Sequence, residues 1–153
     1  MPTPGLKTLA LAAPAALIAA PGVAQSVTDC DTRAGARFLA EPWEDNTATF
    51  AEGAVRIAVI DMMEPAGAPA YLMILSPPRN EIGERQCRIV EAAPHFGFYT
   101  IELADTLASY DPERGLTLRI PVTDYTDGPS NPPPFPLTVT INQSTGDVSA
   151  TID

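Results

Sequence analysis

The sequence has little of what most catalytic and metal-binding proteins depend on. Its 153 residues include one histidine and two cysteines, which excludes a four-ligand zinc site built from these residue types. The only lysine is Lys7, and acidic residues outnumber basic ones by 19 to 9. Nucleic acids and anionic membranes are negatively charged, so an acidic chain is a poor partner for either. The expected partner is therefore another protein or a small molecule.

The chain also has no apolar run long enough to span a bilayer, which takes about 20 residues. The longest run, residues 9–20, follows a basic residue and precedes the small residues Gly22 and Ala24. That arrangement is typical of a secretory signal peptide. We predict that residues 1–24 are removed and that the mature chain begins at Gln25, has no transmembrane segment, and is periplasmic or secreted.

The two cysteines, Cys30 and Cys87, both lie in the predicted mature chain. An even pair in an exported protein usually forms a disulfide, because the compartment is oxidising. We therefore predict a Cys30–Cys87 bond that ties the N-terminal segment to a later strand. The alternative is a pair of buried free thiols.

Apolar and polar residues alternate through most of the mature chain, which is typical of β-strands. The nearly all-apolar segment 70–76 predicts a strand that is buried on both faces. A helix is predicted over Asp29–Glu41, and one or two helical turns over Ala104–Tyr110. Strands are predicted at residues 47–50, 54–61, 70–76, 85–91, 96–103, 115–122, 137–142 and 148–152. The stretch 123–136, rich in proline, is predicted to be the least structured.

These elements predict a single mainly β domain over residues 25–153. Seven to eight short strands at close spacing are typical of an antiparallel β-sandwich or open barrel, here with a short N-terminal helix.

The single histidine, His95, is the natural candidate for a general base. It lies between two predicted strands, in the sequence Pro94-His95-Phe96-Gly97. A small hydrolase or lyase would pair it with a carboxylate such as Asp61 or Glu91. The chain has no Gly-x-Ser-x-Gly nucleophile motif. Because loop side chains are usually exposed, the alternative is an exposed histidine that folding does not require.

Met62, Met73 and His95 have a spacing that resembles the ligand pattern of the periplasmic copper-chaperone family. That family has His or Met, then Met, then His, and a final Met two residues beyond the His. The resemblance implies Cu(I) binding by these three residues, whose soft ligand atoms suit Cu(I). Gly97 stands where the last methionine belongs, so the pattern is incomplete. The alternative is that Met73 fills the core and Met62 packs at the end of a hairpin.

The signal peptide, the size and the alanine-rich composition with arginine in place of lysine resemble short exported hypothetical proteins of Gram-negative bacteria. That resemblance implies a compartment and no activity. We expect a non-enzymatic binding or interaction domain with no assigned catalytic residue and no cofactor. The alternatives are a Cu(I)-handling protein and a small hydrolase or lyase with His95 as base.

Overall fold

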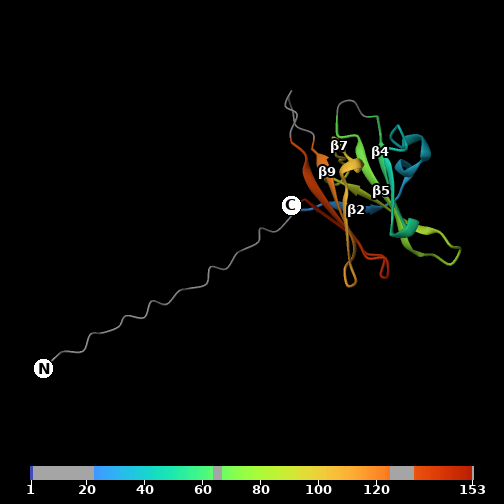
Figure 1. The fold of residues 1–153 in the computed structure, drawn as a ribbon. Coiled ribbons are helices and arrows are strands. Elements are labelled where there is room, and N and C mark those ends of the chain that lie inside the picture. The colour runs from blue at the N-terminus through green and yellow to red at the C-terminus, as the bar shows by residue number, and fades with distance from the viewer. Residues whose placement is uncertain (2–22, 64–66, 125–132, 153) are drawn as a thin grey trace.

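The chain folds into two antiparallel β-sheets that pack face to face (Figure 1). The structure, a computed structural model, describes Met1 and residues 23–63, 67–124 and 133–152. This confirms the predicted mainly β fold, and the two separate sheets make it a sandwich. Most of the predicted signal peptide lies outside the described residues, as does much of the predicted loop 123–136.

The first sheet has six strands, in the order β1-β11-β10-β9-β7, with β8 also paired to β9. Its strands are β1 (Val23–Ala24), β7 (Thr100–Ile101), β8 (Leu107–Asp111), β9 (Gly115–Thr123), β10 (Phe135–Ile141) and β11 (Val148–Ile152). The second sheet has five strands, in the order β2-β6-β5-β4-β3. Its strands are β2 (Ser26–Asp29), β3 (Thr47–Phe50), β4 (Val55–Asp61), β5 (Ala70–Arg79) and β6 (Arg85–Glu91).

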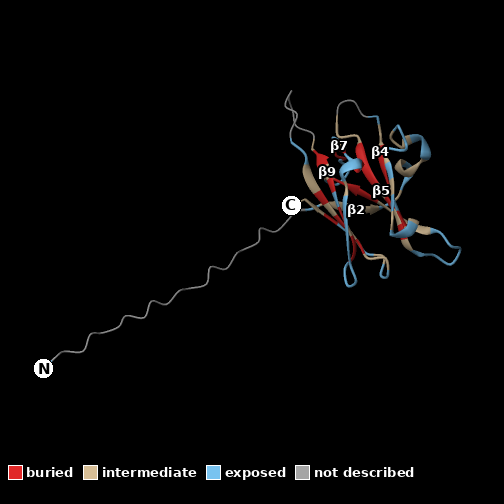
Figure 2. Cartoon of the chain, viewed as in Figure 1, coloured by how far each residue is buried: buried red, intermediate tan, exposed pale blue. Residues whose placement is uncertain are grey.

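The main core lies between the sheets because alternate residues of each strand point inward (Figure 2). In β9, Leu118 and Ile120 are fully buried, and in β5 Leu72 and Ile74 face them from the other sheet. The strand β5 is apolar on both faces, as its sequence predicted, because Tyr71 packs into a second cluster on the outer side.

This second cluster, made of Ile60, Tyr71 and Ile89, is covered by the segment 30–39. The Cys30–Cys87 disulfide holds the segment there, with the two Cα atoms 5.3 Å apart. The predicted bond is thus present, and it attaches the N-terminal segment to β6.

The segment 29–41, predicted as one helix, instead contains two single 3-10 turns, η1 (Thr32–Ala34) and η2 (Ala36–Phe38). Asp29 belongs to β2, and Gly35 between the turns has an extended backbone. The Cys30 N–H donates to the Cys87 carbonyl, and the Ala40 N–H to the Val59 carbonyl. Bonds to the sheet at both ends therefore replace the bonds of a continuous helix. No helix among the described residues is long and apolar enough to cross a membrane.

Two other elements also differ from the predictions. Residues 96–103 contribute only the short strand β7, with a bridge from Phe98 to Ala70. Residues 104–110 form part of a 3-10 turn, η4 (Leu103–Asp105), and then β8. Asp111 accepts backbone N–H bonds from the two residues after Pro112. This local turn directs β8 into a hairpin with β9. A further 3-10 turn, η3 (Ala51–Gly53), joins β3 to β4.

Gln25 joins the two sheets at the start of the predicted mature chain. Its side-chain amide donates to the Ala92 carbonyl at 3.1 Å, just beyond β6, and its side-chain oxygen accepts from the Ile152 N–H of β11 at 3.0 Å. Its own N–H donates to the Ala150 carbonyl. The contacts of Gln25 therefore belong to the fold, although β1 lies within the predicted signal peptide.

Candidate functional site

Two hollows meet on the outer side of the five-stranded sheet and share Arg33, Tyr71 and His95. The first, of about 510 Å³, is also lined by Thr28, Asp29, Asp31, Thr32 and Glu91. The second, of about 270 Å³, is also lined by Met62, Gly67, Ala68, Pro69 and Phe96. We call the two together the His95 site. One half is polar and rich in carboxylates, and the other is largely apolar.

Four separate elements bring the site together. Tyr71 lies on the outer face of β5, and Glu91 is the last residue of β6. Arg33 comes from η1, which the disulfide at Cys30 holds against this sheet. His95 follows β6 in a turn closed by a hydrogen bond from the Phe96 N–H to the Ala93 carbonyl.

Arg33 lies at the centre of a charge network that runs from the half-exposed Asp31 to the buried Glu91. One guanidinium nitrogen is 2.5 Å from Glu91 Oε1, another is 2.8 Å from Asp31 Oδ2, and the guanidinium carbon lies 4.9 Å from the centre of the Tyr71 ring. The hydrogen bond to Asp31 raises the pKa of Arg33 most, and the hydrogen bond to Glu91 raises it further. Burial alone would lower this pKa. In return, the hydrogen bond from Arg33 lowers the pKa of Asp31. The arginine is therefore a fixed part of the structure, with its charge already neutralised.

Glu91 is the least exposed member of this network, with 2 % of its side chain accessible. Its Oε1 contacts Arg33, and its Oε2 accepts the backbone N–H of His95 at 2.9 Å. A buried carboxylate needs such partners, because burying an unpaired charge is strongly unfavourable. Glu91 thus fixes both the segment that carries Arg33 and the turn that carries His95.

His95 is held by its backbone, and the residue as a whole is exposed. Its φ of 68° lies in the left-handed region, and its carbonyl accepts from the Tyr71 hydroxyl at 3.5 Å. The structure brings His95 next to Glu91, as the hydrolase alternative required, but the contact is to the backbone and not to the ring. Asp61, the other candidate, does not line the site, and its carboxylate accepts from the Met63 N–H. Among residues 23–63, 67–124 and 133–152, therefore, no carboxylate orients the imidazole.

The predicted copper ligands are only partly brought together. Met62 and His95 line the same hollow, whereas Met73 lies farther along β5 and packs on the second cluster, outside the lining. Gly97 is buried, and a Cβ there would lie 2.5 Å from the Ala70 carbonyl oxygen. The position where the copper family has its last methionine thus has no room for a side chain. No group of three or more His, Cys, Asp or Glu suited to a metal occurs among the described residues.

The sequence analysis assigned no role in the site to Arg33, Tyr71, Phe96 or Asp31. The sequence of β6 held an indirect indication of Arg33. Glu91 continues the alternation of Cys87 and Ile89, so it falls on a strand face with apolar neighbours. A carboxylate at such a position needs a cation, and a nearby arginine could have been sought. Phe96 follows His95 directly in the sequence, but nothing in the sequence placed Tyr71 next to them.

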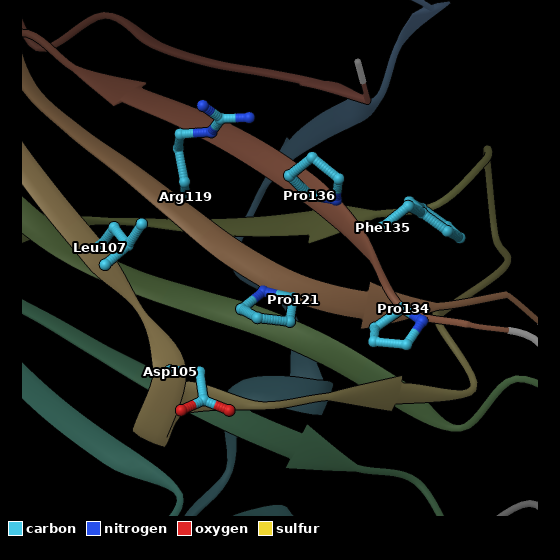
Figure 3. Close-up of a pocket in the computed structure, with 7 residues that line it drawn as sticks. All are labelled: Asp105, Leu107, Arg119, Pro121, Pro134, Phe135 and Pro136. Carbon is cyan, nitrogen blue, oxygen red and sulfur yellow. The ribbon is translucent and has the colours of Figure 1, made fainter.

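A further hollow, of about 380 Å³, lies on the outer face of the six-stranded sheet (Figure 3). Its lining comes from the start of β8, from β9 and from the start of β10: Asp105, Leu107, Arg119, Pro121, Pro134, Phe135 and Pro136. It is dominated by proline rings and apolar side chains, so it offers less chemistry than the His95 site.

No protein-family model, curated protein or solved structure matches this chain. The resemblances to copper chaperones and to short exported proteins therefore remain predictions from sequence.

Proposed function

We propose that this protein is a non-enzymatic exported domain that binds, at the His95 site, a ligand combining a positive charge with an apolar group. The observation that carries the proposal is the junction of a carboxylate-rich hollow with an apolar one at Arg33, Tyr71 and His95. A ligand spanning the junction would meet both kinds of surface at once.

The charge of the first hollow favours a cation. Its lining has three carboxylates and one guanidinium, and Arg88 forms an ion pair with one of these carboxylates, Asp29, so these five groups together carry a net charge of −1. Arg33 is already engaged by Asp31 and Glu91, so it is not free to attract an anion. The excess of acidic over basic residues in the whole chain also favours a positively charged ligand.

The second hollow supplies apolar contact area. Phe96 is 66 % exposed and lines this hollow with Met62 and Pro69. Aromatic and thioether side chains around a concave surface, with a few polar groups nearby, are typical of ligand sites. The exposed position of Phe96 suits it to contact a ligand more than to stabilise the fold.

Export is supported by the disulfide and by the predicted signal peptide. Structural disulfides persist in oxidising compartments such as the periplasm or the exterior. The bond also preorganises the site, because it fixes the segment that carries Asp31 and Arg33.

The test is an NMR titration of the oxidised chain 25–153 with tryptamine and, separately, with indole-3-acetate. These probes share a ring and have opposite charges. Tryptamine is expected to shift the resonances of His95 and Phe96, and indole-3-acetate to leave them unchanged. Phe96→Ala and Asp31→Asn should each weaken tryptamine binding, whereas Ile82→Ala, at a residue 80 % exposed in the β5–β6 turn, should not. The proposal would be contradicted if both probes bound equally well, or if neither probe bound at millimolar concentration.

Cu(I) handling is a second candidate, favoured by the shared hollow of Met62 and His95. With Met73 outside the lining and no side chain at Gly97, we expect little retention of Cu(I) against a chelator such as bathocuproine disulfonate. Tight binding of one Cu(I) per chain, lost in both Met62→Leu and His95→Ala, would favour copper over the amine ligand.

A further inference from the structure

The strand β8 (Leu107–Asp111) forms an open edge of the six-stranded sheet. It pairs with β9 on one side, and no described strand pairs with the other. All five of its residues are exposed, as Figure 2 shows along this strand. Leu107 and Tyr110 are exposed by 70 % and 67 % although both side chains are large and apolar.

This edge lacks the features that usually prevent strands from pairing with other chains. Protected edges carry lysine, proline, an inward-pointing charge or a β-bulge. The sequence Leu-Ala-Ser-Tyr-Asp has no lysine or proline, and its one charge, Asp111, is at the end of the strand. The register with β9 continues without a bulge from Leu107 to Asp111.

The core face of the sheet also continues uncovered onto β8. Ala108 lies opposite Leu118 and Tyr110 opposite Leu116, and such cross-strand pairs share one face. Leu118 and Leu116 are buried between the sheets, whereas Ala108 and Tyr110 are exposed. The opposite sheet therefore ends before it reaches this strand.

We propose that β8 pairs in antiparallel fashion with β8 of a second copy, about a two-fold axis through Ser109. In this register, Ala108 of one copy lies opposite Tyr110 of the other, so each tyrosine ring covers a small side chain. Leu107 lies opposite Asp111, and the two Ser109 residues face each other, so like charges are not directly opposed. The pairing is isologous, since both copies contribute the same residues, and it joins two six-stranded sheets into one.

The dimer is weak and depends on salt. A five-residue strand pair is smaller than a standard stable interface, so the dimer is expected to dissociate on dilution. The acidic copies repel each other, and salt screens that repulsion over about 8 Å at physiological ionic strength. Raising the salt concentration should therefore strengthen the dimer.

Sedimentation velocity of the oxidised chain 25–153, over about 5–500 µM, tests the proposal. The wild type should shift from monomer to dimer as the concentration rises. Ser109→Lys places two ammonium groups opposite each other at the axis, and it should remain monomeric with an unchanged melting temperature. Ser144→Lys is the matched control, since Ser144 is also exposed but lies in the turn between β10 and β11, outside every strand.

Cross-linking identifies the register. Directly opposed residues have Cβ atoms about 4.5–5.5 Å apart, so Ser109→Cys should give a disulfide-linked dimer on mild oxidation, and Ser144→Cys should not. The proposal is overturned if the wild type stays monomeric or if the dimer persists in Ser109→Lys. A monomeric wild type would indicate that a different protein pairs with this edge. β8 and the His95 site lie in different sheets, so dimerisation and ligand binding can fail independently.

Discussion

Replacing Arg33 with methionine should destabilise the fold far more than the loss of an ordinary surface charge. The substitution leaves the Glu91 carboxylate, 2 % exposed, with only the His95 N–H as a described partner. Removing one partner of a buried ion pair typically costs about 3–5 kcal/mol. That is a large part of the roughly 5–15 kcal/mol that holds a domain folded.

Two further variants test whether the cost in stability comes from the burial of the charges or only from their closeness. Arg88 and Asp29 also form an ion pair, at 2.6 Å, but the Asp29 side chain is 85 % exposed. Arg88→Met should therefore cost less than about 1 kcal/mol. The double variant Arg33→Met/Glu91→Leu removes both buried charges, and it should recover most of the stability lost by Arg33→Met alone, because no charge is left unpaired.

Urea unfolding of the oxidised chain at pH 7 gives all these free energies of unfolding. The reasoning would be refuted if Arg33→Met cost no more than Arg88→Met. It would also be refuted if the double variant were as unstable as the single one, because the unpaired Glu91 charge would then not be the cause.

Four other outcomes are expected. Replacing Cys30 and Cys87 with alanine should lower the free energy of unfolding in urea by up to about 4 kcal/mol, since the bond closes a loop of about 58 residues; an unchanged midpoint would show that the bond adds nothing. The pKa of Asp31 is lowered in the folded state by its arginine neighbour, so its contribution to stability is present above the unfolded pKa of about 3.9 and is lost as the pH falls through the lower folded value. Melts between pH 2 and 7 should show this loss, and Asp31→Asn should reduce it. His95→Ala should change the free energy of unfolding by less than about 1 kcal/mol because the residue is exposed, and a loss above 2 kcal/mol would count against this. N-terminal sequencing of exported protein should begin at Gln25, and an intact Met1 would contradict the predicted cleavage.

The strands could be predicted where the pattern of apolar and polar residues lay within the strand's own segment. Residues 54–61 and 85–91 alternate, and residues 70–76 are almost continuously apolar, and each forms a strand close to the predicted bounds. The errors lie where distant partners decide the conformation. Residues 29–41 and 104–110 had helical patterns, yet the first is held by bonds to β6 and β4 and the second by its hairpin with β9.

The site was predicted only in part for a similar reason. His95, Glu91 and Met62 were singled out by residue type, and the structure places all three at the same site. Their relations were not visible in the sequence. Glu91 binds the backbone of His95 and the side chain of Arg33, which lies 58 residues earlier in the chain.

The sequence by itself determined the fold class and the disulfide. Alternation at period two requires a sheet with one face buried, and it can be read from a few neighbouring residues. Tertiary structure alone decided how the outer faces and edges were used. Whether a carboxylate is paired, a methionine reaches a hollow or a strand is left at an edge depends on which segments lie next to it, and those contacts join residues far apart in the chain.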